Sequence, residues 1–273
     1  MATKKAGSTA KKSTRAKSQP AKTTKSTVTT VRAVETAKAE STTSRFGDRR
    51  TALAAALIGE FVGAFLLVGA YLVTKGEPLY MGFVLITLVL MVGTLSGAYL
   101  NPALTVGAWV TRKIGHLRAV GYIVAQLLGA GAAFVVLTSF VNAAAGDASS
   151  AYASQASVFT MAALTEKNHW FAIAAELLGA TILAFAFAGA LREKTDRVAK
   201  ALTVGFGLFV AALTTGVALS YLGANVALNP AVALAATAVD WTKIDLLAAA
   251  AYFLAPLVGG IIGFALRDVV ETK

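Results

Sequence analysis

Two Asn-Pro-Ala triplets are the residues of this sequence whose types and spacing could do chemistry. They consist of Asn101, Pro102 and Ala103, and of Asn229, Pro230 and Ala231. The side-chain oxygen of asparagine accepts a backbone N–H at a helix start, and proline, which lacks an N–H, suits the first helical position. Each triplet therefore predicts a helix start, with the amide NH₂ group of its asparagine left free to donate hydrogen bonds.

The segments that the triplets begin, residues 101–111 and 229–239, are apolar but short. At about 1.5 Å per residue, a helix of this length reaches about halfway across a bilayer. A helix that starts inside the bilayer carries unsatisfied backbone N–H groups and the positive end of its dipole. Two such helix starts at the midplane would favour a neutral hydrogen-bond acceptor and disfavour a cation.

Six longer apolar segments accompany the triplets in a chain of 273 residues that is 56% hydrophobic. Each is close to the roughly 20 residues that cross a bilayer as a helix. They are residues 51–74, 79–97, 117–141, 170–191, 199–222 and 244–266. The pattern predicts an all-α membrane protein with six transmembrane helices and two half-helices.

The two halves of the chain repeat each other. The stretch ALIGEFVGAFLLVGA, which contains Glu60, matches AIAAELLGATILAFA, which contains Glu176, and each is followed by a second span and a triplet. Three spans reverse the direction of the chain, so the second half, about residues 170–268, is expected to be inverted relative to the first, about residues 51–141. The half-helices should then enter from opposite faces and meet near the midplane.

The charge of the chain is concentrated at its N-terminus. Residues 1–50 hold 13 Lys and Arg against 3 Asp and Glu, out of 25 and 14 in the whole chain. They are expected to form a disordered basic tail, and residues 269–273 a short C-terminal tail. The basic tail is interpreted first as a solvated segment that sets topology, second as a contact for anionic lipid, and last as a contact for nucleic acid, which no accompanying motif supports.

Basic connections also predict the orientation of the chain. The connections at residues 112–118 and 192–200 are rich in Lys and Arg, as the tail is, and they alternate with connections that carry few positive charges. Positive loops remain on the cytoplasmic side of a membrane. Both termini are therefore expected to be cytoplasmic, in a multi-pass protein of the plasma or inner membrane.

Over residues 51–268 the sequence resembles the major intrinsic protein family of aquaporins and aquaglyceroporins. The resemblance is carried by GEFVGAFLLV, SGAYLNPALTV, YIVAQLLGA, AELLGA, the second triplet and APLVGGIIGFAL. It implies an aquaporin-like channel domain with one pore per subunit, usually as a homotetramer, with Asn101 and Asn229 as midplane donors. In such a protein Glu60 and Glu176 would support the pore loops; a proton relay or cation ligand is the alternative for intramembrane carboxylates.

The sequence departs from this family after the second triplet, where members usually carry Arg and this chain has Val232. Other constriction positions correspond to Met81 and Val226, and Tyr99 stands where the family often has His. Three residues of the fifth span are candidates for the remaining position: Thr214, Thr215 and Val217. Without a guanidinium, this mainly aliphatic ring is expected to be wider, drier and less hostile to cations.

The expected function is a passive channel for water and small neutral solutes such as glycerol or urea. Alternatives are a pore for ammonia or other small, weakly polar molecules, and a pore that is gated by dewetting. An alternative of another class is a membrane anchor or adhesion protein with a closed pore. The sequence has no cysteine and shows no nucleophile–base pair or phosphate-binding glycine loop, so no enzyme activity, metal or cofactor is expected.

Overall fold

The computed structural model describes residues 27–146, 157–236 and 245–271. Residues 1–48 and residues 49–273 form separate units. The second unit contains the apolar helices and is described below. The described residues form helices and loops without β-strands, as the sequence predicts.

Six helical segments among the described residues are long and apolar enough to cross a membrane. The first is the part of α1 (Thr27–Thr74) that begins at Arg50. The next four are α2 (Pro78–Ser96), α4 (His116–Gly146), α5 (His169–Ala190) and α6 (Arg197–Ser220). The last is formed by α8 (Leu246–Ala249), the π-helical turn η1 (Ala250–Leu254) and α9 (Ala255–Glu271). The six predicted spans are therefore confirmed, with ends shifted by a few residues.

The π-helical turn η1 lies immediately before the only proline of the last span. Ala255 donates its backbone N–H to the carbonyl oxygen of Ala250, five residues earlier. Proline at position 256 has no N–H to continue the α-helical pattern, and a π turn is a common local adjustment in such a helix. The irregularity keeps the span continuous rather than ending it.

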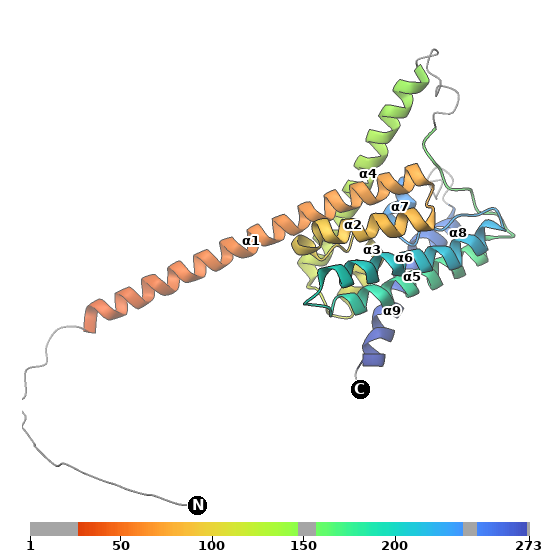
Figure 1. The fold of residues 1–273 in the computed structure, drawn as a ribbon. Coiled ribbons are helices and arrows are strands. Elements are labelled where there is room, and N and C mark those ends of the chain that lie inside the picture. The colour runs from red at the N-terminus through yellow and green to blue at the C-terminus, as the bar shows by residue number, and fades with distance from the viewer. Residues whose placement is uncertain (1–26, 147–156, 237–244, 272–273) are drawn as a thin grey trace, which may run out of the picture. The chain divides into compact units, whose positions relative to one another are not determined.

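Both triplets begin short helices, as predicted. Helix α3 covers Pro102–Val110 and α7 covers Pro230–Ala235. The expected end of the second half-helix, residues 237–239, lies outside the described residues. Each short helix packs on the third span of the opposite half: α3 contacts α9, and α7 contacts α4 (Figure 1). This exchange interlocks the halves of the inverted repeat.

Glycine allows α3 to lie directly against α9. A Cβ atom at Gly107 would lie 2.5 Å from the carbonyl oxygen of Gly260. A Cβ atom at Gly260 would in turn collide with the carbonyl oxygen of Ala103, the third residue of the first triplet. Small residues permit such backbone contact between membrane helices. The close contact fixes the height at which Asn101 begins its helix.

The termini of the membrane domain differ from the predicted tails. Helix α1 begins at Thr27, so residues 27–50 are helical rather than disordered, and α9 continues to Glu271. Residues 27–50 contain no proline, and 10 of these 24 residues are Ala, Arg, Glu or Lys, which are good helix formers. Extending an existing membrane helix avoids the cost of nucleation, so such a sequence can continue it. The predicted disorder of residues 1–26 lies outside the described residues.

Ion pairs join the C-terminal end of α9 to two neighbouring loops. Asp268 contacts Lys113 at 2.8 Å and Arg192 at 3.0 Å. Glu271 contacts Arg192 at 2.5 Å and also pairs with Arg267 one turn earlier. These side chains are partly exposed, so each pair contributes at most about 1 kcal/mol. The cluster aligns the loop after α3 and the loop after α5 with the last span.

Candidate pore

The two asparagines cap their helices and also tie the two halves together. The Oδ1 atom of Asn101 accepts the N–H of Ala103 at 2.8 Å, and that of Asn229 accepts the N–H of Ala231 at 2.9 Å. The Nδ2 atom of Asn101 donates to the carbonyl oxygen of Leu228 at 2.8 Å.

The equivalent bond in the other half runs from Asn229 Nδ2 to the carbonyl oxygen of Leu100, at 3.0 Å. The sequence predicted that these amide groups would be free. The two bonds show that they are only partly free. One hydrogen of each NH₂ group holds the opposite loop, and an amide has two. Both asparagines still line the central cavity, so one donor hydrogen on each remains for a permeant.

Two fully buried carboxylates hold the loops that precede the asparagines. Glu60 accepts the backbone N–H groups of Tyr99 at 3.0 Å and Leu100 at 2.7 Å. In the other half, Glu176 accepts those of Ala227 at 2.5 Å and Leu228 at 2.8 Å. Each carboxylate thus uses both oxygens on backbone donors that lipid could not satisfy.

The hydrogen bonds to the carboxylates compensate for strain in the loops. Leu100 has φ 52° and Leu228 has φ 55°, in the left-handed region. Such a conformation costs on the order of 1–3 kcal/mol for a residue with a side chain. It lets each leucine direct its N–H to a glutamate and its carbonyl oxygen to the opposite asparagine. Glu60 also accepts a hydrogen bond from Gln126 Nε2 at 2.6 Å and one from the side chain of Ser96.

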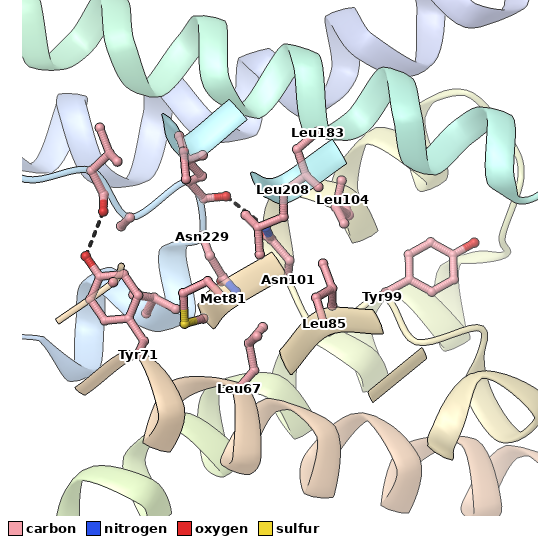
Figure 2. Close-up of a pocket in the computed structure, with 16 residues that line it drawn as sticks. Leu67, Tyr71, Met81, Leu85, Tyr99, Asn101, Leu104, Leu183, Leu208 and Asn229 are labelled. Atoms are coloured by element: carbon pink, nitrogen blue, oxygen red, sulfur yellow. Dashed lines mark hydrogen bonds between the residues drawn. The ribbon is translucent and has the colours of Figure 1, made fainter. Parts of the chain in front are cut away.

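A narrow cavity runs between the loops, and Figure 2 shows 16 residues that line it. Asn101 and Asn229 lie in its middle, with Tyr71 near one end and Tyr99 near the other. Much of the remaining lining is aliphatic: Leu67, Leu85, Leu104, Leu183 and Leu208. The cavity has about 30 Å³ of room for water, where a single molecule needs about 10–15 Å³. The width of the opening stays a prediction.

Three of the six predicted constriction residues line this cavity. They are Met81, Val226 and Val232. Thr214 and Thr215 instead border a separate depression between α5 and α6, which corrects their assignment to the constriction.

Helix α6 presents a different face to the pore than the sequence indicated. Leu208 and Ala212 line the central cavity, and Gly216 lines a second cavity beside it. These residues are four apart and share one helix face, whereas Thr214 lies on the opposite side of the helix and Thr215 at the edge of the shared face. Val217, the remaining candidate, lines the second cavity but not the central one.

The second cavity has a volume of about 200 Å³ and opens beside the turn between α1 and α2. Lys75 and Glu77 contribute charged side chains to it, and Ser220 and Asn225 contribute polar ones. Its polar lining contrasts with the aliphatic lining of the central cavity. Tyr71, Gly76, Ala212 and Val226 line both cavities, so the polar cavity adjoins the aliphatic one.

Sequence reasoning missed Tyr71, which lines both cavities. A signal for it was present in the first span. Glu60, Ala64, Leu67 and Tyr71 recur at intervals of three and four residues, which places them on one helix face. The face that brings Glu60 into the bundle therefore also brings Tyr71 into it.

Six spans, an inverted repeat and two half-helices that meet at capping asparagines define a membrane protein of the aquaporin type. Residues 49–267 match the major intrinsic protein family, and the chain belongs to that family. An X-ray structure of the aquaglyceroporin from Plasmodium falciparum shares the fold. The TM-score is 0.56 at 22% sequence identity, over 81% of this chain and 96% of that one.

Curated relatives match parts of the chain. It is 34% identical over 94 residues to the glycerol uptake facilitator protein-like 6 of Lactiplantibacillus plantarum, covering 32% of this chain and 44% of that protein. It is 28% identical over 156 residues to aquaporin AqpM of Methanothermobacter marburgensis, covering 56% of this chain and 58% of that protein. The chain thus spans about half the length of these relatives.

Proposed function

We propose that this protein is a passive membrane channel that conducts water and small neutral solutes through the cavity between Asn101 and Asn229. The observation that carries the proposal is the pair of asparagine amides, each at the start of a half-helix, facing a passage with no charged residue among the described residues that line it. The amides donate to neutral molecules, and the two positive helix ends repel cations. Chemistry on a bound substrate is not part of this function.

Two classes of solute are supported by different observations. The names of the glycerol uptake facilitator and the aquaglyceroporin support glycerol or a similar polyol. The narrow and largely aliphatic lining instead supports smaller, weakly polar molecules such as ammonia, since it offers few groups to replace a hydration shell. Urea lies between these classes in size and polarity. Water accompanies either class.

Glu60 and Glu176 act in this proposal as supports of the pore loops rather than as proton carriers. Their oxygens already accept two backbone N–H groups each, and both side chains are fully buried behind the loops. Neither glutamate is among the residues that line the central cavity. A permeating molecule would therefore contact the loops and not the carboxylates.

In this proposal the chain crosses a plasma or inner membrane, and both of its termini lie in the cytoplasm. The basic loops at residues 112–118 and 192–200 support this orientation, because positive charge is retained inside. The second cavity, beside Tyr71, then faces outward. A homotetramer is the assembly that the family resemblance implies, and the basic tail contacts anionic lipid rather than nucleic acid.

Deleting residues 1–45 separates a channel from a membrane anchor whose tail is the working part. The channel function predicts that the shortened protein in liposomes conducts water, glycerol or urea as fast as the full chain, because the pore lies within residues 49–267. Stopped-flow light scattering after an osmotic step measures these rates, with empty vesicles as the baseline. Flux that disappears with the tail would contradict the proposal.

A further inference from the structure

Four residues line both the central cavity and the second cavity, and so mark the neck between them. They are Tyr71, Gly76, Ala212 and Val226. Tyr71 is the largest of the four and is 5% exposed. It is also the only one of them whose side chain has a hydrogen-bonding atom. The width and the polarity of the neck therefore depend mainly on this one phenol.

The hydroxyl group of Tyr71 is committed to the second pore loop. Its Oη atom donates to the carbonyl oxygen of Val226 at 2.6 Å, as Figure 2 shows. A phenol has one hydrogen to donate, so none remains for a permeant. The loop that carries Val226 leads directly to Asn229. The bond thus couples the wall of the neck to the position of the asparagine.

The turn between α1 and α2 packs against the ring of Tyr71. Gly76 has φ 73°, and a Cβ atom there would lie 2.6 Å from Cε2 of the tyrosine. The backbone N–H of Gly76 donates to the carbonyl oxygen of Tyr71 at 3.1 Å. The ring of Phe159 lies 6.1 Å away, centroid to centroid, and limits it further. The ring therefore cannot retract without a change in the turn.

We propose that Tyr71 is the specificity-determining residue of this channel: its ring sets the size limit at the neck, and its engaged hydroxyl keeps the neck free of donors. The proposal rests on the channel function proposed above. A molecule that passes must be narrow enough to slip past the ring. It must also part with most of its hydration, because Met81 and Val232 follow on the inner side with apolar side chains.

The test compares permeation rates of Tyr71→Ala and wild-type protein in liposomes by stopped-flow light scattering. The permeants are water, urea, glycerol and the four-carbon polyol erythritol. Removing the ring is expected to raise the ratio of glycerol and erythritol rates to the water rate by about tenfold or more, since pore diameter governs selectivity. Tyr80→Ala is the matched control, because Tyr80 is an exposed aromatic residue of α2 (61%) and its loss should leave the ratio unchanged.

Two further variants separate a size limit from a role in holding the fold. Tyr71→Phe keeps the ring and should keep the solute ratio within about twofold of wild type, because the diameter is preserved. Gly76→Ala should push the ring into the neck and lower every rate. If Tyr71→Ala does not yield monodisperse protein, Tyr71→Leu takes its place, and it too should raise the ratio.

The outcomes distinguish the size limit from the channel function. Wild-type protein that conducts water, with a solute ratio that Tyr71→Ala or Tyr71→Leu leaves unchanged, would overturn the role of Tyr71 and leave the channel intact. A ratio that rises equally in Tyr80→Ala would also overturn it. Wild-type rates equal to those of empty vesicles for all four permeants would overturn the channel function itself, and the size limit with it.

Discussion

Replacing Glu176 with alanine is expected to abolish conduction and to destabilise the protein. The substitution leaves the backbone N–H groups of Ala227 and Leu228 buried without their acceptor. Each unsatisfied buried donor costs about 1–3 kcal/mol. Leu228 also loses a bond that compensates for its left-handed backbone, so the loop that presents Asn229 should collapse into the cavity. Stopped-flow water permeability and thermal unfolding in detergent measure the two effects.

The conservative variant Glu176→Gln tests whether the support requires both carboxylate oxygens. A glutamine keeps one oxygen acceptor but turns an NH₂ group toward the second backbone N–H, so conduction of water should be reduced and not abolished. Glu166→Ala, at an exposed loop glutamate, serves as the control for loss of a carboxylate. Glu176→Ala protein that conducts like the wild type would show that the carboxylate does not hold the pore loop.

The second large effect is expected from Val232→Arg. Val232 is 2% exposed and lines the central cavity, which has about 30 Å³ of room for water. A guanidinium there occupies part of that room and adds a fixed positive charge. Glycerol and urea fluxes should fall at least about tenfold, and cation exclusion should persist or sharpen, because diameter and electrostatic barrier both set selectivity.

The matched control for this prediction is Val217→Arg. Val217 is 43% exposed and lines the second cavity but not the central cavity, so a charge there should leave solute flux close to that of the wild type. Solute rates and their ratio to water are compared in liposomes for the two variants. An unchanged solute profile in Val232→Arg would mean that position 232 does not line the constriction.

The backbone of the pore could be predicted because its determinants are local in sequence. Asn101 and Asn229 are each followed by proline, a pair that is typical of a helix start. The six spans follow from length and apolar composition. The repeat between the halves then fixes the inversion and aligns Glu60 with Glu176. Each of these features depends on spacing along the chain, which the sequence displays directly.

The walls of the pore could be predicted only in part because they depend on helix rotation. Thr214 and Thr215 are within one turn of Ala212 on α6. They nevertheless border the depression between α6 and α5 and not the central cavity. At about 100° per residue, Thr214 lies about 200° and Thr215 about 60° away from Ala212 around the helix axis. The bond between Tyr71 and Val226 joins residues 155 positions apart, and no local pattern encodes it.

The cross-bonds of the asparagines were hidden for a similar reason. Capping explains the oxygen of each side chain, but the partner of its NH₂ group lies in the other half of the chain. The helical start at Thr27 shows the opposite limit: low hydrophobicity suggested disorder for residues 27–50, whereas α1 includes them.

The most direct test of conduction through the central cavity is the osmotic water permeability of liposomes that contain Ala212→Trp. Ala212 lies in the neck, so an indole there should lower the rate to that of empty vesicles. Thr214→Trp is the control, because this exposed residue of the same helix borders the depression beside α5 and is not among the residues that line the central cavity, and it should conduct like the wild type. Equal and fast permeation by both folded variants would contradict a path through this cavity.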